Sequence, residues 1–150
     1  MGAARSAQIE LLPLGIGPIW AAIHAECAVE ILGRTPWIPV PSASELIPGV
    51  IAHRGRAVAV LDLGVVLPDL PRLTARSTRE RVVIARTSLG LVALPVEKVH
   101  EVVSVPSAEV REATLTRGSP FEVTIDDKAM PLVDLETILE QRGLARPGAG

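Results

Sequence analysis

Short apolar segments separated by turn residues dominate the pattern along the chain. Several of these segments are rich in Val and Ile, and Gly or Pro stands between most of them. They span residues 8–14, 18–23, 29–32, 57–63, 81–86, 90–96, 99–105, 120–125 and 129–133. Strands of this length at close spacing, with turn signals between them, are typical of an all-β sandwich or barrel. The pattern therefore predicts an all-β fold.

One helix is predicted near the end of the chain. Asp134 is a suitable N-cap, because its side-chain oxygen can accept hydrogen bonds from the N–H groups of the first turn. Leu135, Ile138 and Leu139 then follow at helical spacing and form one apolar stripe. Gly143 can end the helix in a left-handed conformation. A single C-terminal helix is therefore expected beside the strands.

Two phrases of the sequence occur twice. RAVAVLDL at residues 56–63 returns as KAMPLVDL at residues 128–135, a shift of 72. AIHAECAVEIL at residues 22–32 aligns with ALPVEKVHEVV at residues 93–103, a shift of 71. Two echoes in the same order and at nearly the same shift indicate an internal duplication.

The duplication predicts how the chain is organised. It is interpreted as one domain of 150 residues with similar halves at about 8–67 and 80–142. Each half is too small to bury a strong core alone, so the halves are expected to share apolar surface. Asp62 and Asp134 occupy matched positions, where each is predicted to cap the turn or helix that follows. Two acids that share a proton are the alternative. Residues 144–150 are expected to be a disordered tail.

Composition and charge exclude several classes of protein. The formal net charge is -2 and aromatic residues make up 2%, which argues against a nucleic-acid-binding surface. No apolar run is long enough to cross a membrane, and the first residues lack the apolar region of a secretory signal. Cys27 is the single cysteine, so no internal disulfide is possible. A cytoplasmic protein without direct membrane insertion is expected.

A search for catalytic chemistry finds no motif. The three histidines, His24, His53 and His100, lack the spacing of a metal site, and there is no Cys-x-x-Cys pair. No phosphate-binding or dinucleotide-binding glycine loop and no G-x-S-x-G motif occurs. Cys27 is interpreted as a core residue. We therefore expect a protein that is not an enzyme and carries no metal or cofactor.

The segment GVIAHRGRAVAVLDL, residues 49–63, resembles the signature strand–turn–strand of CheW-like domains. LVALPVEKVHEVV, residues 91–103, is similar to the phrase of that family's second half, and IPVP at residues 38–41 matches the loop before the signature. The resemblance covers about residues 8–139. It implies two SH3-like five-stranded β-barrel subdomains that share a hydrophobic seam, with a C-terminal helix.

The resemblance also implies a function. CheW-like proteins are non-catalytic adaptors of bacterial chemotaxis, a two-component signal-transduction system. They couple the cytoplasmic tips of chemoreceptors, the methyl-accepting proteins, to the regulatory domain of a CheA-type histidine kinase. Arg54 matches the arginine that this family places in its partner-binding turn. The resemblance therefore assigns receptor and kinase binding to Arg54, Gly55, His53, Ile51 and Val50.

Two further readings stay open. Ala52 and His53 stand where the family has Asn and Leu, which leaves room for an accessory paralogue that binds the receptor and engages the kinase weakly. A small-ligand-binding β-barrel protein is the alternative from another class, because apolar barrels can hold one ligand. A narrow SH3-like barrel leaves little space for a cavity, which counts against that alternative.

Overall fold

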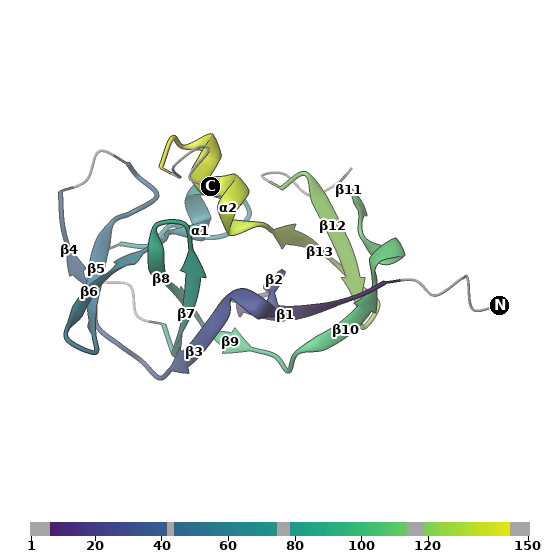
Figure 1. Cartoon of the computed structure of the whole chain (residues 1–150), viewed down its shortest axis with the longest axis horizontal. Helices are drawn as coiled ribbons and strands as arrows, with labels where there is room; N and C mark the ends of the chain where they lie inside the picture. Colours follow the sequence, from purple (N-terminus) through teal and green to yellow (C-terminus); the bar gives the residue numbers. More distant parts are fainter. Residues whose placement is uncertain (1–6, 42–43, 75–78, 114–118, 145–150) are drawn as a thin grey trace.

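The strands form two sheets that lie side by side along the long axis of the molecule (Figure 1). The computed structural model describes residues 7–41, 44–74, 79–113 and 119–144. Sheet A has the order β10-β1-β2-β13-β12-β11, with β9 paired to β1, and sheet B has the order β3-β7-β8-β6-β5-β4. The strands of sheet A are β1 Gln8–Ile16, β2 Ile19–His24, β9 Lys98–Val99, β10 Val103–Pro106, β11 Arg111–Glu112, β12 Phe121–Ile125 and β13 Lys128–Val133. Those of sheet B are β3 Ala28–Leu32, β4 Ile38–Pro39, β5 Gly49–His53, β6 Arg56–Val60, β7 Arg81–Thr87 and β8 Gly90–Val96.

This architecture confirms the predicted all-β class with two sheets and a C-terminal helix. In each sheet, five strands have four or more residues, as the two five-stranded barrels require. The two-residue strands β4, β9 and β11 are additions that the apolar pattern did not predict, because so short a strand has no periodicity of its own.

The two sheets do not coincide with the two halves of the sequence. The β1–β2 hairpin comes from the first half, yet it pairs with β13 of the second half in sheet A. The β7–β8 hairpin comes from the second half and pairs with β6 of the first half in sheet B. Leu132 lies opposite Ala22 in one parallel pair, and Val60 lies opposite Ala93 in the other. These are repeat-equivalent contacts, so the halves have exchanged their first hairpins within one chain.

A continuous hydrophobic seam joins the two sheets. Residues from both sheets and from the C-terminal helix are buried in one cluster: Leu12, Leu14, Ile16, Ala21, Ile23, Leu46, Leu61, Leu63, Leu67, Leu70, Val83, Ala85, Val92, Leu94, Val96, Val133, Leu135, Ile138 and Leu139. Smaller clusters fill each barrel, around Leu11 and Val123 in sheet A and around Ile51 and Ile84 in sheet B. Because the largest cluster contains residues of both sheets, each barrel buries part of its apolar surface against the other.

The two matched aspartates accept hydrogen bonds from the short helices that follow them. Asp62 Oδ1 accepts from the N–H of Gly64 at 2.9 Å, at the start of α1 Leu63–Val66. Asp62 Oδ2 accepts from the N–H of Leu73 at 2.9 Å. Asp134 Oδ1 accepts from the N–H groups of Glu136 and Thr137 at 3.0 and 3.4 Å, at the start of α2 Leu135–Gln141. Both side chains thus satisfy backbone donors that would otherwise lack partners.

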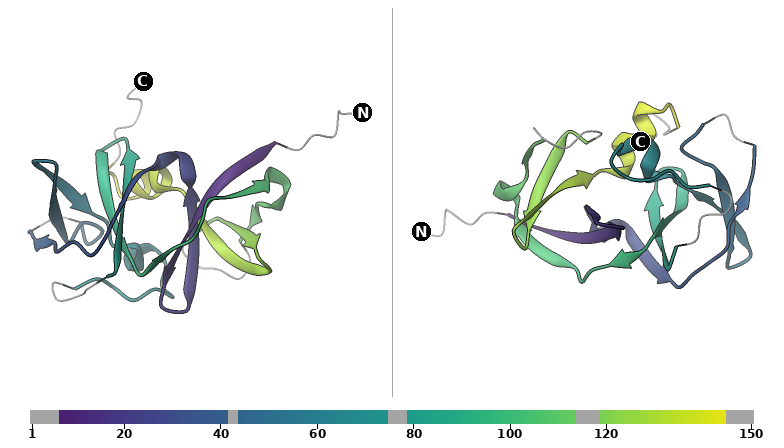
Figure 2. Two further views of the ribbon diagram at one scale, coloured as in Figure 1. Left: turned by 90° about the horizontal axis from the view of Figure 1, so that it is seen from below. Right: turned by 180° about the vertical axis from the view of Figure 1, so that it is seen from behind.

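The C-terminal helix packs back onto the first. Figure 1 and the view from behind in Figure 2 show α2 beside α1, and Arg142 Nη2 donates to the carbonyl oxygen of Val65 at 3.4 Å. Gly143 has a φ of 69°, which ends the helix as predicted. Leu144 donates its N–H to the carbonyl oxygen of Leu139 at 2.8 Å and packs against the seam. The expected disordered tail therefore cannot begin at residue 144, and residues 145–150 lie outside the described residues.

Candidate functional site at the Arg54 turn and the exposed strip

Arg54 and Gly55 form the two-residue turn of the β5–β6 hairpin. Their φ angles are 51° and 77°, both in the left-handed region. Two such residues between antiparallel strands make a type I′ turn, whose twist matches that of the strands. Gly55 adopts this conformation without steric cost, whereas Arg54 is held in it by the hairpin. The turn fixes the direction in which the Arg54 side chain leaves the barrel, and that side chain is 73% exposed.

Glu30 on β3 is the partner of both basic side chains at this turn. Its Oε1 accepts a hydrogen bond from Arg54 Nη2 at 3.1 Å and lies 3.3 Å from His53 Nε2. An exposed ion pair contributes about 0–1 kcal/mol, so this contact positions the guanidinium more than it stabilises the fold. Sequence analysis did not assign Glu30 to the site. The repeat gave no signal for it, because the pairing depends on the contact between β3 and the turn.

The other residues predicted to bind a partner differ in accessibility. Gly55 is exposed beside Arg54, and Val50 is half-buried between Ile38 of β4 and Ala59 of β6. Ile51 is 1% exposed and belongs to the core of its barrel, so its side chain is not accessible at the surface of this turn. The His53 side chain is 10% exposed, and its Nε2 contacts Glu30, so it helps to hold Glu30 beside the turn. On β5, alternate side chains point to opposite faces, and the signature motif contains residues of both faces.

Sequence analysis did not identify a set of exposed apolar residues on β3 and beside β10. Val29 and Ile31 flank Glu30 on β3 and are 45% and 49% exposed, and Val102, between β9 and β10, is 53% exposed. Figure 1 and the view from behind in Figure 2 place β3 and the β9–β10 connection along the same lower edge of the molecule. We call Val29, Ile31 and Val102 the exposed strip.

The exposed strip follows from the duplication and from strand position. Ile31 and Val102 are repeat-equivalent, since they differ by the shift of 71 residues. Strand β3 is at an edge of sheet B and β10 is at an edge of sheet A. An edge strand with apolar residues on both faces leaves one of those faces uncovered. The sequence shows apolar residues at alternate positions of β3. The strand order then shows that no described strand pairs with the free edge of β3, which leaves Val29 and Ile31 exposed.

Potential reactive groups in the described part of the chain do not assemble into a site. No cluster of three or more His, Cys, Asp or Glu side chains suited to a metal ion is found among the described residues. The Cys27 thiol donates to the carbonyl oxygen of His24 at 3.0 Å, and burial raises the pKa of this thiol. A thiol with a raised pKa is a poor nucleophile at neutral pH. In the same ranges, no helix is both long and apolar enough to span a membrane.

The fold, taken with the exposed strip, defines an all-β scaffold of two interlocked barrels. The model of the CheW-like domain family matches residues 10–143, and the chain therefore belongs to this family. It is 24% identical over 136 residues to the chemotaxis protein CheW of Rhizobium meliloti (strain 1021), with 86% of each chain covered. Its fold is similar to that of the scaffolding protein TtCheW of Thermoanaerobacter tengcongensis, with a TM-score of 0.71 and 19% identity over 89% of this chain and 94% of that chain.

Proposed function

We propose that this protein is a non-catalytic adaptor of a bacterial chemosensory array in the cytoplasm. It binds the cytoplasmic tip of a chemoreceptor and couples it to the regulatory domain of a CheA-type histidine kinase. The observation that carries the proposal is the exposed strip; its residues Val29 and Ile31 flank Glu30, the partner of Arg54, along β3. An apolar centre with a charged rim is the usual anatomy of a surface that binds another protein.

The shape and charge of this surface suit a helical partner. Strand β3 presents Val29 and Ile31, the connection before β10 presents Val102, and a helix packed against them would contact all three with one apolar stripe. Arg54 can then donate two parallel hydrogen bonds to a carboxylate on the helix, because its guanidinium is planar. Membership of the CheW-like family supports a receptor as the partner.

Kinase coupling is the second part of the proposal. His53 stands at the position before Arg54 and is turned toward Glu30, so the turn presents a single arginine rather than an apolar residue beside it. This favours an accessory member of the family that binds the receptor well and the kinase weakly. A small ligand inside a barrel has less support, because buried side chains fill the interior of each barrel.

The experiment measures binding of a receptor-tip fragment and, separately, of the kinase regulatory domain by calorimetric titration. Ile31→Asp should weaken receptor binding by about tenfold, because it places a charge at the centre of an apolar contact. Ile38→Asp is the matched control, since Ile38 is 62% exposed on β4 and outside the strip. Equal losses for the two variants, or no binding of the receptor tip by the wild-type protein, would falsify the proposal.

A further inference from the structure

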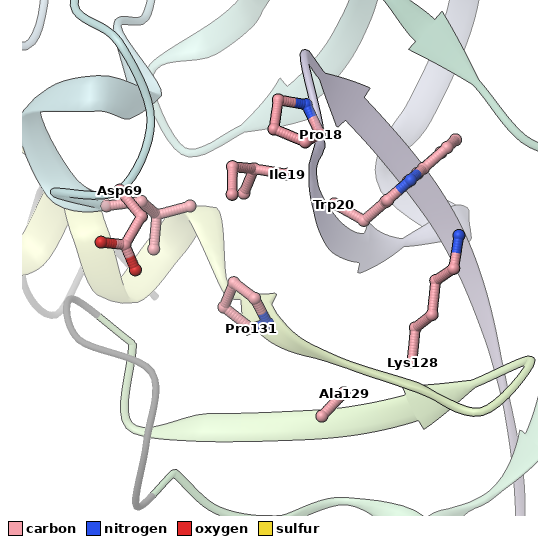
Figure 3. A pocket seen from close by; sticks show the side chains of 8 residues that line it. Pro18, Ile19, Trp20, Asp69, Lys128, Ala129 and Pro131 are labelled. Carbon is pink, nitrogen blue, oxygen red and sulfur yellow. The ribbon is translucent and has the colours of Figure 1, made fainter.

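A groove on another part of the molecule lies between sheet A and the segment that follows α1. It has a volume of about 390 Å³ and is formed by the β1–β2 turn, strand β13 and the segment after α1. Pro18, Ile19, Trp20 and Pro131 give it apolar walls, and the charged side chains of Asp69 and Lys128 also line it. The groove shares no residue with the exposed strip or the Arg54 turn. Figure 3 shows Trp20 and Lys128 on one side of the opening and Asp69 on the opposite side.

Trp20 is held in place at the edge of this groove. A Cβ at Gly15 would lie 3.2 Å from ring atoms of Trp20, so the missing side chain at Gly15 leaves room for the indole on β1. The His100 ring meets the indole edge-on, with centroids 6.3 Å apart, and Lys128 Nζ lies 5.9 Å from the centroid of the indole. A fixed aromatic side chain loses little conformational entropy on binding, which is why Trp often anchors protein interfaces.

The two charged side chains of the groove lack ionic partners among the described residues. Lys128 makes the contact with Trp20 but no ion pair there, and Asp69 has neither an ion pair nor a hydrogen bond through its side chain in that part of the chain. Opposite charges on facing walls leave room for a ligand that carries an acid near Lys128 and a base near Asp69.

Trp20 and Lys128 also line a second, smaller cavity of about 110 Å³, together with His100 and Asp126. Trp20 and Lys128 therefore line both depressions. A small ligand is normally oriented by several convergent buried polar groups. This groove has apolar walls with one charged side chain at each side. Such a surface suits a longer chain segment better than a small ligand.

We propose that this groove is a second docking surface, which binds an amphipathic helix of a partner protein. The helix inserts an apolar side chain between Trp20, Ile19 and Pro131, and it carries an acidic and a basic residue that pair with Lys128 and Asp69. The site goes beyond the receptor and kinase adaptor function, because it uses a separate surface. An adaptor with two such surfaces can hold two partners at once.

The test uses Trp20 as its own reporter. The chain has two tryptophans, so Trp37→Phe leaves Trp20 as the single emitter. The probes are three helical peptides of about 14 residues with one leucine stripe. Their flanking charges are one Glu and one Lys, Glu at both ends, or Lys at both ends. The Trp37→Phe protein should bind the mixed peptide about fivefold more tightly than either of the others, with a shift in Trp20 emission.

Charge substitutions then exchange the preference. Lys128→Glu makes both sides of the groove acidic and should favour the peptide with Lys at both ends, whereas Asp69→Lys should favour the peptide with Glu at both ends. Lys98→Glu is the matched control, because Lys98 is the other lysine of the chain and is exposed on β9. This variant should keep the preference for the mixed peptide.

Four results would overturn the proposal. They are equal affinity of all three peptides, an unchanged Trp20 emission, the same change of preference in Lys98→Glu as in Lys128→Glu, and an equal emission shift with the dipeptide lysyl-glutamate at the same concentration. The last result would identify a site for a small zwitterion instead of a helix. Circular dichroism of each variant checks that the β fold is retained, and the exposed positions of Asp69 and Lys128 favour that outcome.

Discussion

Arg54 and Asp126 occupy the same position of two equivalent hairpin turns and carry opposite charges. Arg54 begins the turn between β5 and β6, and Asp126 begins the turn between β12 and β13, with a φ of 51° in each case. Arg54 pairs with Glu30, whereas Asp126 Oδ2 lies 3.9 Å from His100 Nε2. The two turns share a backbone conformation and carry opposite charges. A partner that recognises one turn through its charge is therefore not expected to bind the other.

Arg54→Ala is expected to weaken binding of the receptor-tip fragment and to leave the fold intact. An arginine at the centre of an interface costs about 2 kcal/mol or more on truncation, and one at an exposed rim about 0–1 kcal/mol. Arg54→Lys should restore the affinity partly, because lysine keeps the charge and loses the planar fork. Titrations at two salt concentrations separate the cases, and Asp126→Ala serves as the control on the equivalent turn. Equal affinities for wild type and Arg54→Ala would leave Arg54 as an ordinary turn residue.

Asp62 and Asp134 should differ in their effect on stability although they are repeat-equivalent. Asp134 is exposed and accepts two hydrogen bonds through one oxygen, so Asp134→Ala should cost about 0.5–2 kcal/mol of unfolding free energy. Asp62 is 2% exposed, accepts from two separate segments, and lies 3.6 Å from Arg72 Nε. Asp62→Ala should cost more, because it leaves buried N–H groups unpaired. Chemical denaturation of both variants measures the difference, and a larger loss for Asp134→Ala contradicts this account.

Gly49 is required where β5 passes β4. A Cβ at this position would overlap the carbonyl oxygen of Ile38 and the ring of Trp37. Gly49→Ala should therefore lower the unfolding free energy by about 1–3 kcal/mol, as overpacking does in other cores. Gly33→Ala is the control, since no heavy atom lies within 4 Å of a Cβ there. Thermal unfolding of the two variants should show a lower midpoint for Gly49→Ala alone.

Cys27 should react slowly with alkylating reagents in the folded protein. Burial is the main cause that raises the pKa of its thiol, so less thiolate is present than in the unfolded chain at the same pH. The sign for stability follows from linkage, because the unfolded state loses this proton first. The protonated thiol therefore contributes fully to the unfolding free energy below the ordinary thiol pKa, and this contribution is lost as the pH rises above that value. Alkylation rates in buffer and in urea measure the effect, and equal rates would show that the thiol is not protected.

The sequence predicted local features of this fold, but it did not predict contacts between segments that are distant along the chain. The short apolar segments predicted most of the longer strands, whereas β5 was implied by the family resemblance; Asp134 and Gly143 marked the ends of the final helix. The matched phrases at 56–63 and 128–135 each contain a strand, β6 and β13. Each element depends on neighbours close in sequence, which is why the pattern was sufficient.

The exchange of hairpins and the role of Glu30 depend on partners far away in sequence. Nothing in the phrase at 22–32 indicates that β2 pairs with β13 rather than with β6, since both choices satisfy the same apolar pattern. The family motif around Arg54 marks a turn, but it mixes exposed Arg54 with buried Ile51 because a strand alternates its faces. The structure was needed to show which residues of the motif are exposed and which are buried.

The exchanged hairpins also set the order in which the protein can be completed during synthesis. All the strands of sheet B lie between residues 28 and 96, whereas sheet A needs β1 and β2 together with strands that end at residue 133. On the ribosome, sheet B can therefore assemble while the N-terminal hairpin still waits for β13 to emerge. During that interval Leu12, Leu14 and Ile23 lack the C-terminal part of their seam. The N-terminal hairpin is thus the segment whose apolar side chains stay exposed longest during synthesis, and it is the expected binding site for a chaperone.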